Sequence, residues 1–308
     1  GKEFWDKFVF NSFYPSNMSR YTLIAPAKFK FNSEVINSSL KPVVKENGDS
    51  KIYTWEIKDV VPVKNENLMP LIGDIGIVLH ISTLKSWADI ANWYSDISYQ
   101  DNANNFELDA AYEEIFKGGI NLTDVEKAKH IYNYILSNIR YSSVSFRQSG
   151  FVPQSISKVL STKLGDCKDL SSLFVALAVK AGLEAQLLLV DTRDNGARDM
   201  VLPSMEFNHC ITLVKLNGKD YYLELTDNNL PFASLPYNLN SALILPVPPY
   251  GQKSTATAIT TLNAGNRMHD KSIKHINVMV NGKDLKMKVA AKRYGGITSA
   301  PGATIMQR

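Results

Sequence analysis

Residues 164–182 read LGDCKDLSSLFVALAVKAG, and this stretch predicts the element around which the fold is built. Asp166 suits the N-cap of a helix, and Asp169 lies three residues later, where it can complete a capping box. Gly182 suits the position that follows a helix end. The apolar residues between them recur at helical spacing on one face: Leu170, Leu173, Phe174, Leu177, Ala178 and Ala181. We therefore predict a buried helix that begins at Cys167.

Cys167 is one of only two cysteines in the chain. At the first position of a helix, free backbone amides and the positive end of the helix dipole stabilise a thiolate. This position suits a nucleophile, and it would equally suit a small packed side chain, so a catalytic role requires partners. Two cysteines are too few for a disulfide framework or a four-cysteine metal site, and the sequence has no C-x-x-C motif of a disulfide oxidoreductase.

A β-hairpin downstream of this helix supplies candidate partners. The runs HCITLVKL (209–216) and KDYYLELT (219–226) flank Asn217-Gly218, a pair that strongly favours a two-residue turn. A turn of this length pairs the residues that flank it directly and so fixes the register of the hairpin. Because side chains two residues apart share a face, the register decides which side chains of the two strands can meet.

In this register His209 and Glu224 are diagonal neighbours on one face, at a separation that long side chains can bridge. Asp227 has the opposite parity and reaches His209 only if the strand bulges or has ended. Cys210 points away from His209, so we expect it to be a buried apolar side chain. A thiol, a histidine and a carboxylate form the set that nucleophilic cysteine chemistry needs, because the imidazole takes the thiol proton and the carboxylate orients the ring. We expect Cys167, His209 and Glu224 to be catalytic, with Asp227 as the alternative acid.

Two long segments resemble the core of bacterial transglutaminase-like proteins: KLGDCKDLSSLFVALAVKAGLEAQLLLV (163–190) and FNHCITLVKLNGKDYYLEL (207–225). The run ILSNIRYSSV (135–144) is similar to the residues that usually precede the cysteine in this family. RYTLIAP (20–26), together with the stretch from WEIKDVVP to SWADIANWY (55–94), resembles the β domain that is often fused before this core. The resemblance therefore covers most of the chain.

The resemblance implies a papain-like fold of the α+β class, with cysteine, histidine and acid in that chain order. Cys167 then corresponds to the nucleophile and His209 to the base. The acid of the family usually lies in an LDxT-type segment after the histidine strand. Here that segment reads LELT, so Glu224 stands in the place of the usual aspartate. The extra methylene moves the carboxylate outward, a shift that the site can absorb or that disturbs catalytic alignment.

We expect the chain to divide into three parts. Strand-forming runs predict a β-rich N-terminal domain, itself incomplete, over residues 1–80. Helices followed by antiparallel strands predict the transglutaminase-like core over residues 81–250, and residues 251–308 form a C-terminal β segment. In this last part, Asn281-Gly282 predicts the turn of a second hairpin. The start GKEFWDKF has neither Met nor a signal-peptide pattern, so we expect a trimmed chain with Gly1 left from cloning.

Charge, hydrophobicity and histidine spacing argue against several kinds of binding partner. The net charge is only +4 and the basic residues are scattered, so we expect no binding to nucleic acid. No apolar run approaches the ~20 residues that cross a membrane. Residues 191–199 lack the ligand pattern of a calcium site, and we expect a mobile loop near the site there. We expect neither metal nor cofactor, because the remaining histidines show no metal-ligand spacing: His80, His130, His269 and His275.

The sequence thus predicts a thiol enzyme that cleaves or transfers an amide bond of a peptide or protein through an acyl-enzyme. We favour hydrolysis, because water is always present whereas transfer to an amine requires a site that excludes water or binds the amine. The alternative is a non-catalytic binding or scaffold protein on a papain-like frame. The glutamate at position 224 favours this alternative, and the intact cysteine and histidine disfavour it. By resemblance we expect a location outside the bacterial cytoplasm, in the periplasm or at the cell surface.

Overall fold

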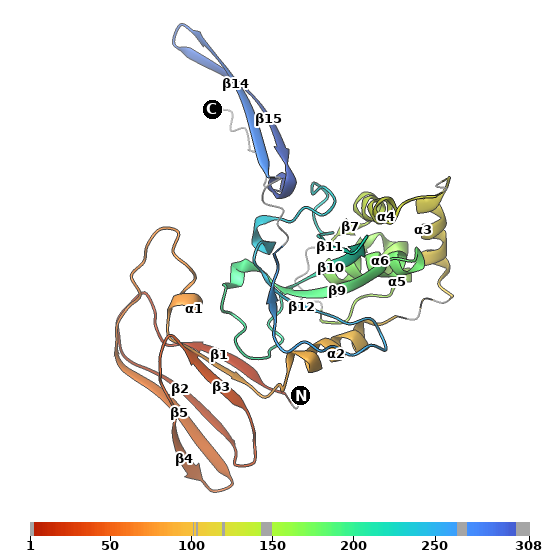
Figure 1. Cartoon of the computed structure of the whole chain (residues 1–308). Coiled ribbons are helices and arrows are strands. Elements are labelled where there is room, and N and C mark those ends of the chain that lie inside the picture. Colours follow the sequence, from red (N-terminus) through yellow and green to blue (C-terminus); the bar gives the residue numbers. More distant parts are fainter. Residues whose placement is uncertain are drawn as a thin grey trace.

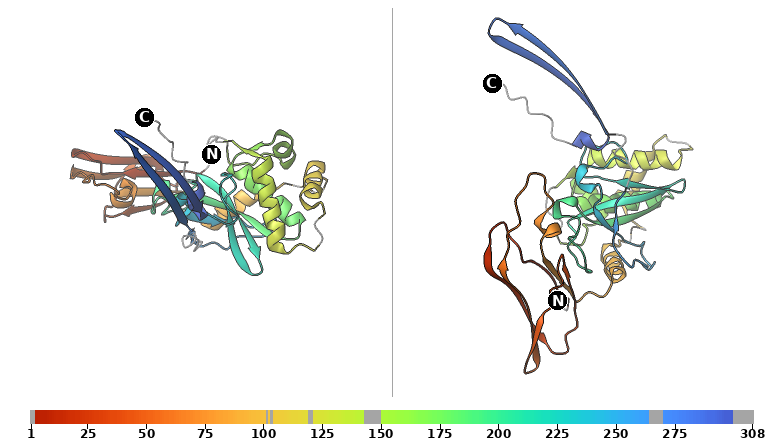
Figure 2. Two further views of the ribbon diagram at one scale, coloured as in Figure 1. Left: turned by 90° about the horizontal axis from the view of Figure 1, so that it is seen from above. Right: turned by 60° about the vertical axis from the view of Figure 1, so that its left-hand side comes forward.

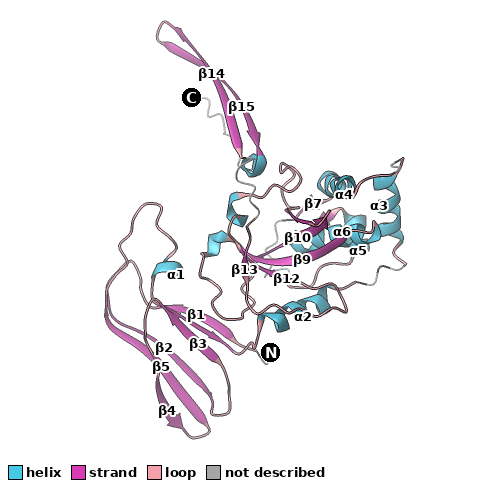
Figure 3. Ribbon diagram, in the orientation of Figure 1, coloured by secondary structure: helices cyan, strands magenta, loops and turns pink. Residues whose placement is uncertain are grey.

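The computed structural model describes residues 3–100, 102, 104–118, 121–142, 150–263 and 270–299. The chain is of the predicted α+β class, with strands at the N-terminal end, a central core of helices and strands, and a C-terminal hairpin (Figure 1 and Figure 3). Among these residues, no helix is both long and apolar enough to span a lipid bilayer.

The N-terminal region, residues 3–82, contains two three-stranded antiparallel sheets, in the orders β1-β6-β3 and β2-β5-β4. Trp55 of one sheet and Leu79 of the other are each 1% exposed and belong to one apolar cluster, so the two sheets share a core. The elements are β1 (Trp5–Val9), β2 (Ser16–Pro26), β3 (Asn32–Ile36), β4 (Val43–Asn47), β5 (Ser50–Val60), the short helix α1 (Ile72–Ile75) and β6 (Val78–Ser82).

The core region is built on a five-stranded antiparallel sheet in the order β11-β10-β9-β12-β13, with α6 packed against it. Its helices are α2 (Trp87–Ser98), α3 (Phe106–Phe116), α4 (Asp124–Asn138), α5 (Ile156–Thr162) and α6 (Cys167–Lys180). Its strands are β7 (Arg140–Tyr141), β8 (Leu164–Gly165), β9 (Glu184–Asp191), β10 (His209–Leu216), β11 (Lys219–Leu223), β12 (Leu243–Pro246) and β13 (Thr260–Thr261). Short 3-10 helices lie at Arg193–Asn195 and Tyr237–Leu239.

Helix α6 has the start and the capping predicted from the sequence. Asp166 is the N-cap, and its carboxylate accepts hydrogen bonds from the amides of Lys168 and Asp169, while the Asp169 carboxylate accepts one from the Asp166 amide. The hydroxyl of Ser171 donates to the carbonyl of Cys210 at 3.2 Å and ties the helix to β10. The helix is therefore capped at its first turn and hydrogen-bonded to β10 about one turn further along.

The hairpin of β10 and β11 has the predicted turn and register. Asn217 and Gly218 both have positive φ, at 52° and 73°, as a two-residue hairpin turn requires. The ladder runs from the pair Leu216 and Lys219 to the pair Thr212 and Leu223, where β11 ends. The chain that carries the candidate acids thus lies just beyond the paired strand.

The C-terminal hairpin consists of β14 (Lys271–Asn281) and β15 (Asp284–Tyr294), followed by a short 3-10 helix, Gly295–Ser299. It projects away from the rest of the molecule (Figure 2). The predicted position of its turn was wrong by one residue, because Asn281 pairs with Asp284 and the turn residues are Gly282 and Lys283. Gly282 has a φ of 62°, and without a Cβ it takes the left-handed first position of the turn at no steric cost.

Candidate active site

Cys167 is the first residue of α6, and only 2% of its surface is exposed. It belongs to a buried cluster that joins α6 to α2 and to Phe207, just before β10. The N-cap bonds use the amides of Lys168 and Asp169, and the amide of Cys167 takes no part in them. That amide and the positive end of α6 are therefore placed to stabilise negative charge at the sulfur or at a nearby oxygen.

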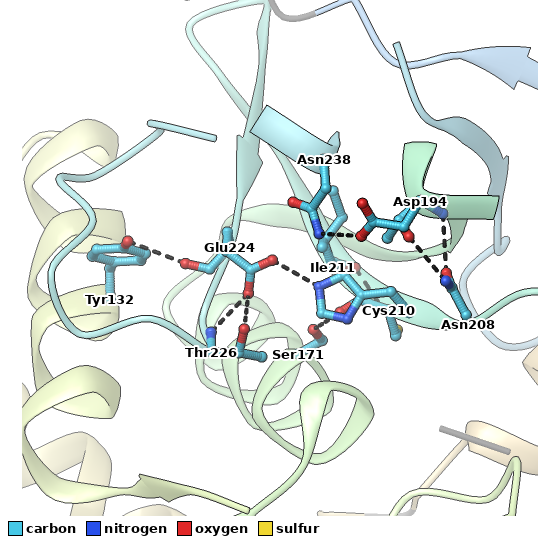
Figure 4. A network of polar contacts seen from close by, with 11 residues as sticks. Tyr132, Ser171, Asp194, Asn208, Cys210, Ile211, Glu224, Thr226 and Asn238 are labelled. Atoms are coloured by element: carbon cyan, nitrogen blue, oxygen red, sulfur yellow. Dashed lines mark hydrogen bonds and ion pairs between the residues drawn. The ribbon is translucent and has the colours of Figure 1, made fainter. Parts of the chain in front are cut away.

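His209, the first residue of β10, lies between Cys167 and Glu224. Its Nε2 is 2.7 Å from Oε2 of Glu224, and its side chain is 14% exposed (Figure 4). On another side the ring adjoins the side chain of Cys167, which contributes to raising the pKa of His209. The imidazole thus lies beside both the thiol and the carboxylate.

In this site the opposite charges of His209 and Glu224 stabilise each other and outweigh the effect of burial. Burial alone would lower the pKa of His209, but the charge of Glu224 and the adjoining side chain of Cys167 raise that pKa well above its ordinary value. Burial likewise disfavours the ionised form of Glu224. The charge of His209, with hydrogen bonds from His209 and Thr226, nevertheless holds the pKa of Glu224 below its ordinary value. An imidazolium beside a carboxylate is the favoured state, so His209 is suited to hold a proton taken from the thiol.

Glu224 is held by its neighbours on both its side chain and its backbone (Figure 4). The backbone amide and the hydroxyl of Thr226 each donate to Oε1 at 2.7 Å, which leaves Oε2 free to face His209. The hydroxyl of Tyr132 in α4 donates to the carbonyls of Glu224 and Leu230, both at 3.1 Å. The carboxylate therefore has one oxygen for support and one for the imidazole.

Asp227, the alternative acid of the sequence analysis, is engaged elsewhere. Its Oδ1 accepts a hydrogen bond from the amide of Asn229 at 2.8 Å, and its carbonyl accepts one from Leu230 at 3.1 Å. Strand β11 does end early, at Leu223, yet the side chain that reaches the imidazole is that of Glu224. Glu224 is therefore the acid that contacts the imidazole, whereas Asp227 accepts a bond within a local turn.

The residues around the start of α6 form a buried polar network that fixes the position of the thiol. Lys168 is 1% exposed and forms an ion pair with Asp166, which is 4% exposed. Asp169 accepts bonds from the amide and the side chain of Gln154, at 2.8 and 2.7 Å. A Cβ at Gly165 would lie 2.9 Å from that of Asp169, so the close packing here requires glycine.

The second cysteine has a different environment. Cys210 lies within β10, is 1% exposed, and has the buried side chain expected from strand alternation. Burial, and after it the charge of Cys167, raises the pKa of Cys210 well above its ordinary value. We therefore expect Cys210 to be a packed thiol of low reactivity under neutral conditions.

Three side chains near the site escaped the reasoning from sequence. Thr226 supports Glu224, Lys168 pairs with the N-cap, and Tyr141 of β7 lies close to the thiol. Burial and then the negative charges of Cys167, Glu224 and Asp166 raise the pKa of Tyr141 to about 12. Only Thr226 had a usable signal, since a hydroxyl two residues after an acid often bonds locally to it.

No metal centre is found in the parts of the chain that the structure describes, where no group of three or more His, Cys, Asp or Glu side chains is arranged to hold an ion. His80 is a buried residue of β6 and is 5% exposed. His269 lies outside the described residues.

Comparison with known protein families identifies two domain types in the chain. Residues 110–223 match the model of the transglutaminase-like superfamily. This chain carries a transglutaminase-like domain. Residues 1–64 match DUF3857, a domain of unknown function, so the β-rich region before the transglutaminase-like domain is also a known domain type. No curated protein matches the sequence.

Among solved structures, a chain described as a "putative protease" from Parabacteroides distasonis is 15% identical, with a TM-score of 0.58. The alignment covers 80% of this chain and 46% of that one, so this chain spans less than half the length of that protein. At this identity the similarity shows the shared fold. A "putative cysteine protease" from Cytophaga hutchinsonii aligns over 94% of this chain and 92% of that chain, at 10% identity and a TM-score of 0.34, too low to bear on the fold.

Proposed function

We propose that this transglutaminase-like chain is a thiol enzyme that acts on amide bonds of peptides or proteins through an acyl-enzyme at Cys167. The observation that supports this most strongly is the position of His209, which adjoins the side chain of Cys167 and is hydrogen-bonded to Glu224. In our proposal Cys167 is the nucleophile, His209 the base, and Glu224 the acid that orients the base.

The proposed reaction follows from the charges of the site. His209 takes the proton of the Cys167 thiol, and Glu224 stabilises the resulting imidazolium. The thiolate attacks the amide carbon, and the Cys167 amide donates to the oxyanion that forms. The imidazolium then gives its proton to the leaving amine as the carbon–nitrogen bond breaks. The acyl group remains on the sulfur as a thioester.

Water completes the proposed cycle. His209 removes a proton from water as the oxygen attacks the thioester, and the carboxylic acid leaves with regeneration of the thiol. We favour hydrolysis over transfer to an amine because water is always available to the thioester. An amine that attacked in place of water would give a new amide, so the same acyl-enzyme serves both outcomes.

The alternative is a non-catalytic binding protein on the same frame, and its main support was the replacement of aspartate by glutamate. The 2.7 Å bond from Glu224 to His209 weakens that support, because the longer side chain makes the contact that the usual acid would make. The buried position of Cys167 is compatible with either function.

The proposal can be tested with an unfolded, carboxymethylated protein as substrate. Wild-type protein should generate new amino termini, and addition of a fluorescent primary amine should reveal any transfer product. Cys167→Ala should abolish both signals, while Cys210→Ala serves as the matched control and should retain them. Equal activity in the wild type and Cys167→Ala would refute the proposed nucleophile.

We further propose that the protein acts outside the bacterial cytoplasm, as the resemblance to transglutaminase-like proteins implies. Fractionation of the cells that make the full-length protein tests this directly. Recovery with cytoplasmic markers would refute the location.

A further inference from the structure

The chain between β9 and β10, residues 192–208, contributes side chains to the buried apolar cluster that contains Cys167, and we call it the docked segment. Apart from the 3-10 turn at Arg193–Asn195, it has no regular secondary structure. Two of its side chains, Met200 and Met205, are 4% and 7% exposed and belong to the same buried cluster as Cys167. A long irregular chain is costly to hold in one conformation, so its position requires contacts from elsewhere.

The docked segment is closed at its base. The amide of Thr192 donates to Oδ1 of Asn208 at 3.0 Å, and Nδ2 of Asn208 donates to the hydroxyl of Thr192 at 2.9 Å. These bonds fix the two ends of the segment next to β9 and β10. The outer part, residues 196–206, is left for other contacts to position.

Those contacts come from the N-terminal region, beginning with α1 (Figure 1). The carboxylate of Asp74 accepts hydrogen bonds from the amides of Ala197 and Arg198, at 2.9 and 2.8 Å to the same oxygen. Gly196 has a φ of 113°, and a Cβ there would lie 2.8 Å from that oxygen. The sequence thus has glycine at a position where a side chain would collide with the Asp74 carboxylate.

Further contacts are spread along the outer part. The side-chain oxygen of Asn37 accepts a hydrogen bond from Nη1 of Arg198 at 2.8 Å, and Lys7 forms an ion pair with Asp199. Nearer the end of the segment, the hydroxyl of Ser82 donates to the carbonyl of Pro203 at 2.5 Å. Nε1 of Trp5 donates to the carboxylate of Glu206 at 3.0 Å. The side chain of Asp199 is 7% exposed and that of Lys7 is 32% exposed, so the ion pair lies partly in solvent. Strands β1 and β6 and helix α1 of the N-terminal region therefore all hold the same segment.

We propose that the N-terminal region holds the docked segment in place, with Asp74 as a positioning residue for the part of the apolar cluster around Cys167 that this segment supplies. This inference rests on the proposed function for its importance, and on the contacts above for its geometry. Loss of these contacts, which we call the brace, frees residues 196–206 and loosens the apolar cluster around Cys167. Reagents too large for the closed site then reach the sulfur, and a substrate meets a less defined surface.

Three variants test the brace. Asp74→Ala removes the acceptor, Asp74→Asn keeps an oxygen that can accept from both amides, and Asp49→Ala is a control in the exposed turn between β4 and β5. Two measurements are made on each full chain: hydrogen exchange of residues 196–206, and the ratio of Cys167 modification rates for a bulky maleimide and for iodoacetamide. Neither measurement depends on turnover.

Asp74→Ala should speed hydrogen exchange in residues 196–206 at least about tenfold, because two amides lose a charged acceptor, while exchange in β10 stays unchanged. The ratio of bulky to small reagent should rise in the same variant. Asp74→Asn should restore both readouts towards wild type, and Asp49→Ala should alter neither.

Unchanged exchange in Asp74→Ala would overturn the brace. Faster exchange with an unchanged reagent ratio would overturn its coupling to the thiol site. If the variants show these structural effects but the wild type forms no acyl-enzyme, the proposed function fails while the brace stands.

Discussion

Replacing Glu224 by Gln removes the charge that lies 2.7 Å from Nε2 of His209, while the size and shape of the side chain are kept. A hydrogen bond between charged groups contributes about 1.5–3 kcal/mol, and each 1.4 kcal/mol corresponds to a factor of ten. The imidazolium that balances the Cys167 thiolate loses this contribution. The population of the reactive ion pair, and with it the rate of thiol alkylation near neutral pH, should fall about 10- to 150-fold.

The assay is the rate of alkylation of Cys167 by iodoacetamide, a reagent small enough for a nearly buried sulfur, followed by peptide mass spectrometry from about pH 5 to about pH 9. Asp227→Asn is the matched control, because Asp227 caps a local turn and does not reach the imidazole. Circular dichroism establishes that both variants are folded. A change of less than about twofold in Glu224→Gln, or an equal loss in Asp227→Asn, would refute the assigned acid.

Other consequences follow from the same contacts. Cys167 should be alkylated at least about tenfold faster than Cys210, because only Cys167 has a base and a helix start beside it; equal labelling would contradict this. Thr226→Val should slow alkylation of Cys167 about tenfold by removing one donor to the carboxylate, and Thr226→Ser should retain the wild-type rate. In thermal unfolding, the advantage of wild type over Glu224→Gln should be greatest at about pH 5 to 6, above the unfolded pKa of glutamate and below that of histidine. It should shrink as the pH rises through the raised pKa of His209, and a constant advantage would argue against the ion pair.

Short sequence motifs were sufficient to predict helix α6 and the hairpin of β10 and β11, which carry the site residues. The capping residues Asp166 and Asp169 set the start of α6, and the turn residues Asn217 and Gly218 set the register of the hairpin. Both signals act over a few residues, where backbone geometry leaves few alternatives. They therefore placed the thiol and the histidine strand correctly without tertiary information.

The parts that sequence could not give depend on contacts between distant residues. Strand β11 ends at Leu223, and the carbonyl of the next residue, Glu224, accepts a hydrogen bond from Tyr132 of α4, which is distant in the sequence. The burial of Lys168 follows from its pairing with Asp166, since composition alone would place a lysine at the surface. Likewise, nothing in residues 191–199 reveals that Asp74 of the N-terminal region holds them. Such contacts join residues that are far apart in the sequence, and no local pattern shows which distant residues will meet.

The most direct test of the central claim is to trap the acyl-enzyme. Wild-type protein is mixed with a small activated acyl donor such as p-nitrophenyl acetate, quenched in acid, and examined by intact mass and peptide mapping. We predict one acyl group on Cys167, a much lower yield in His209→Ala, and none in Cys167→Ala, in which Cys210 is still present. No adduct in the wild type, or the same yield in Cys167→Ala, would contradict the assignment of Cys167 as the nucleophile.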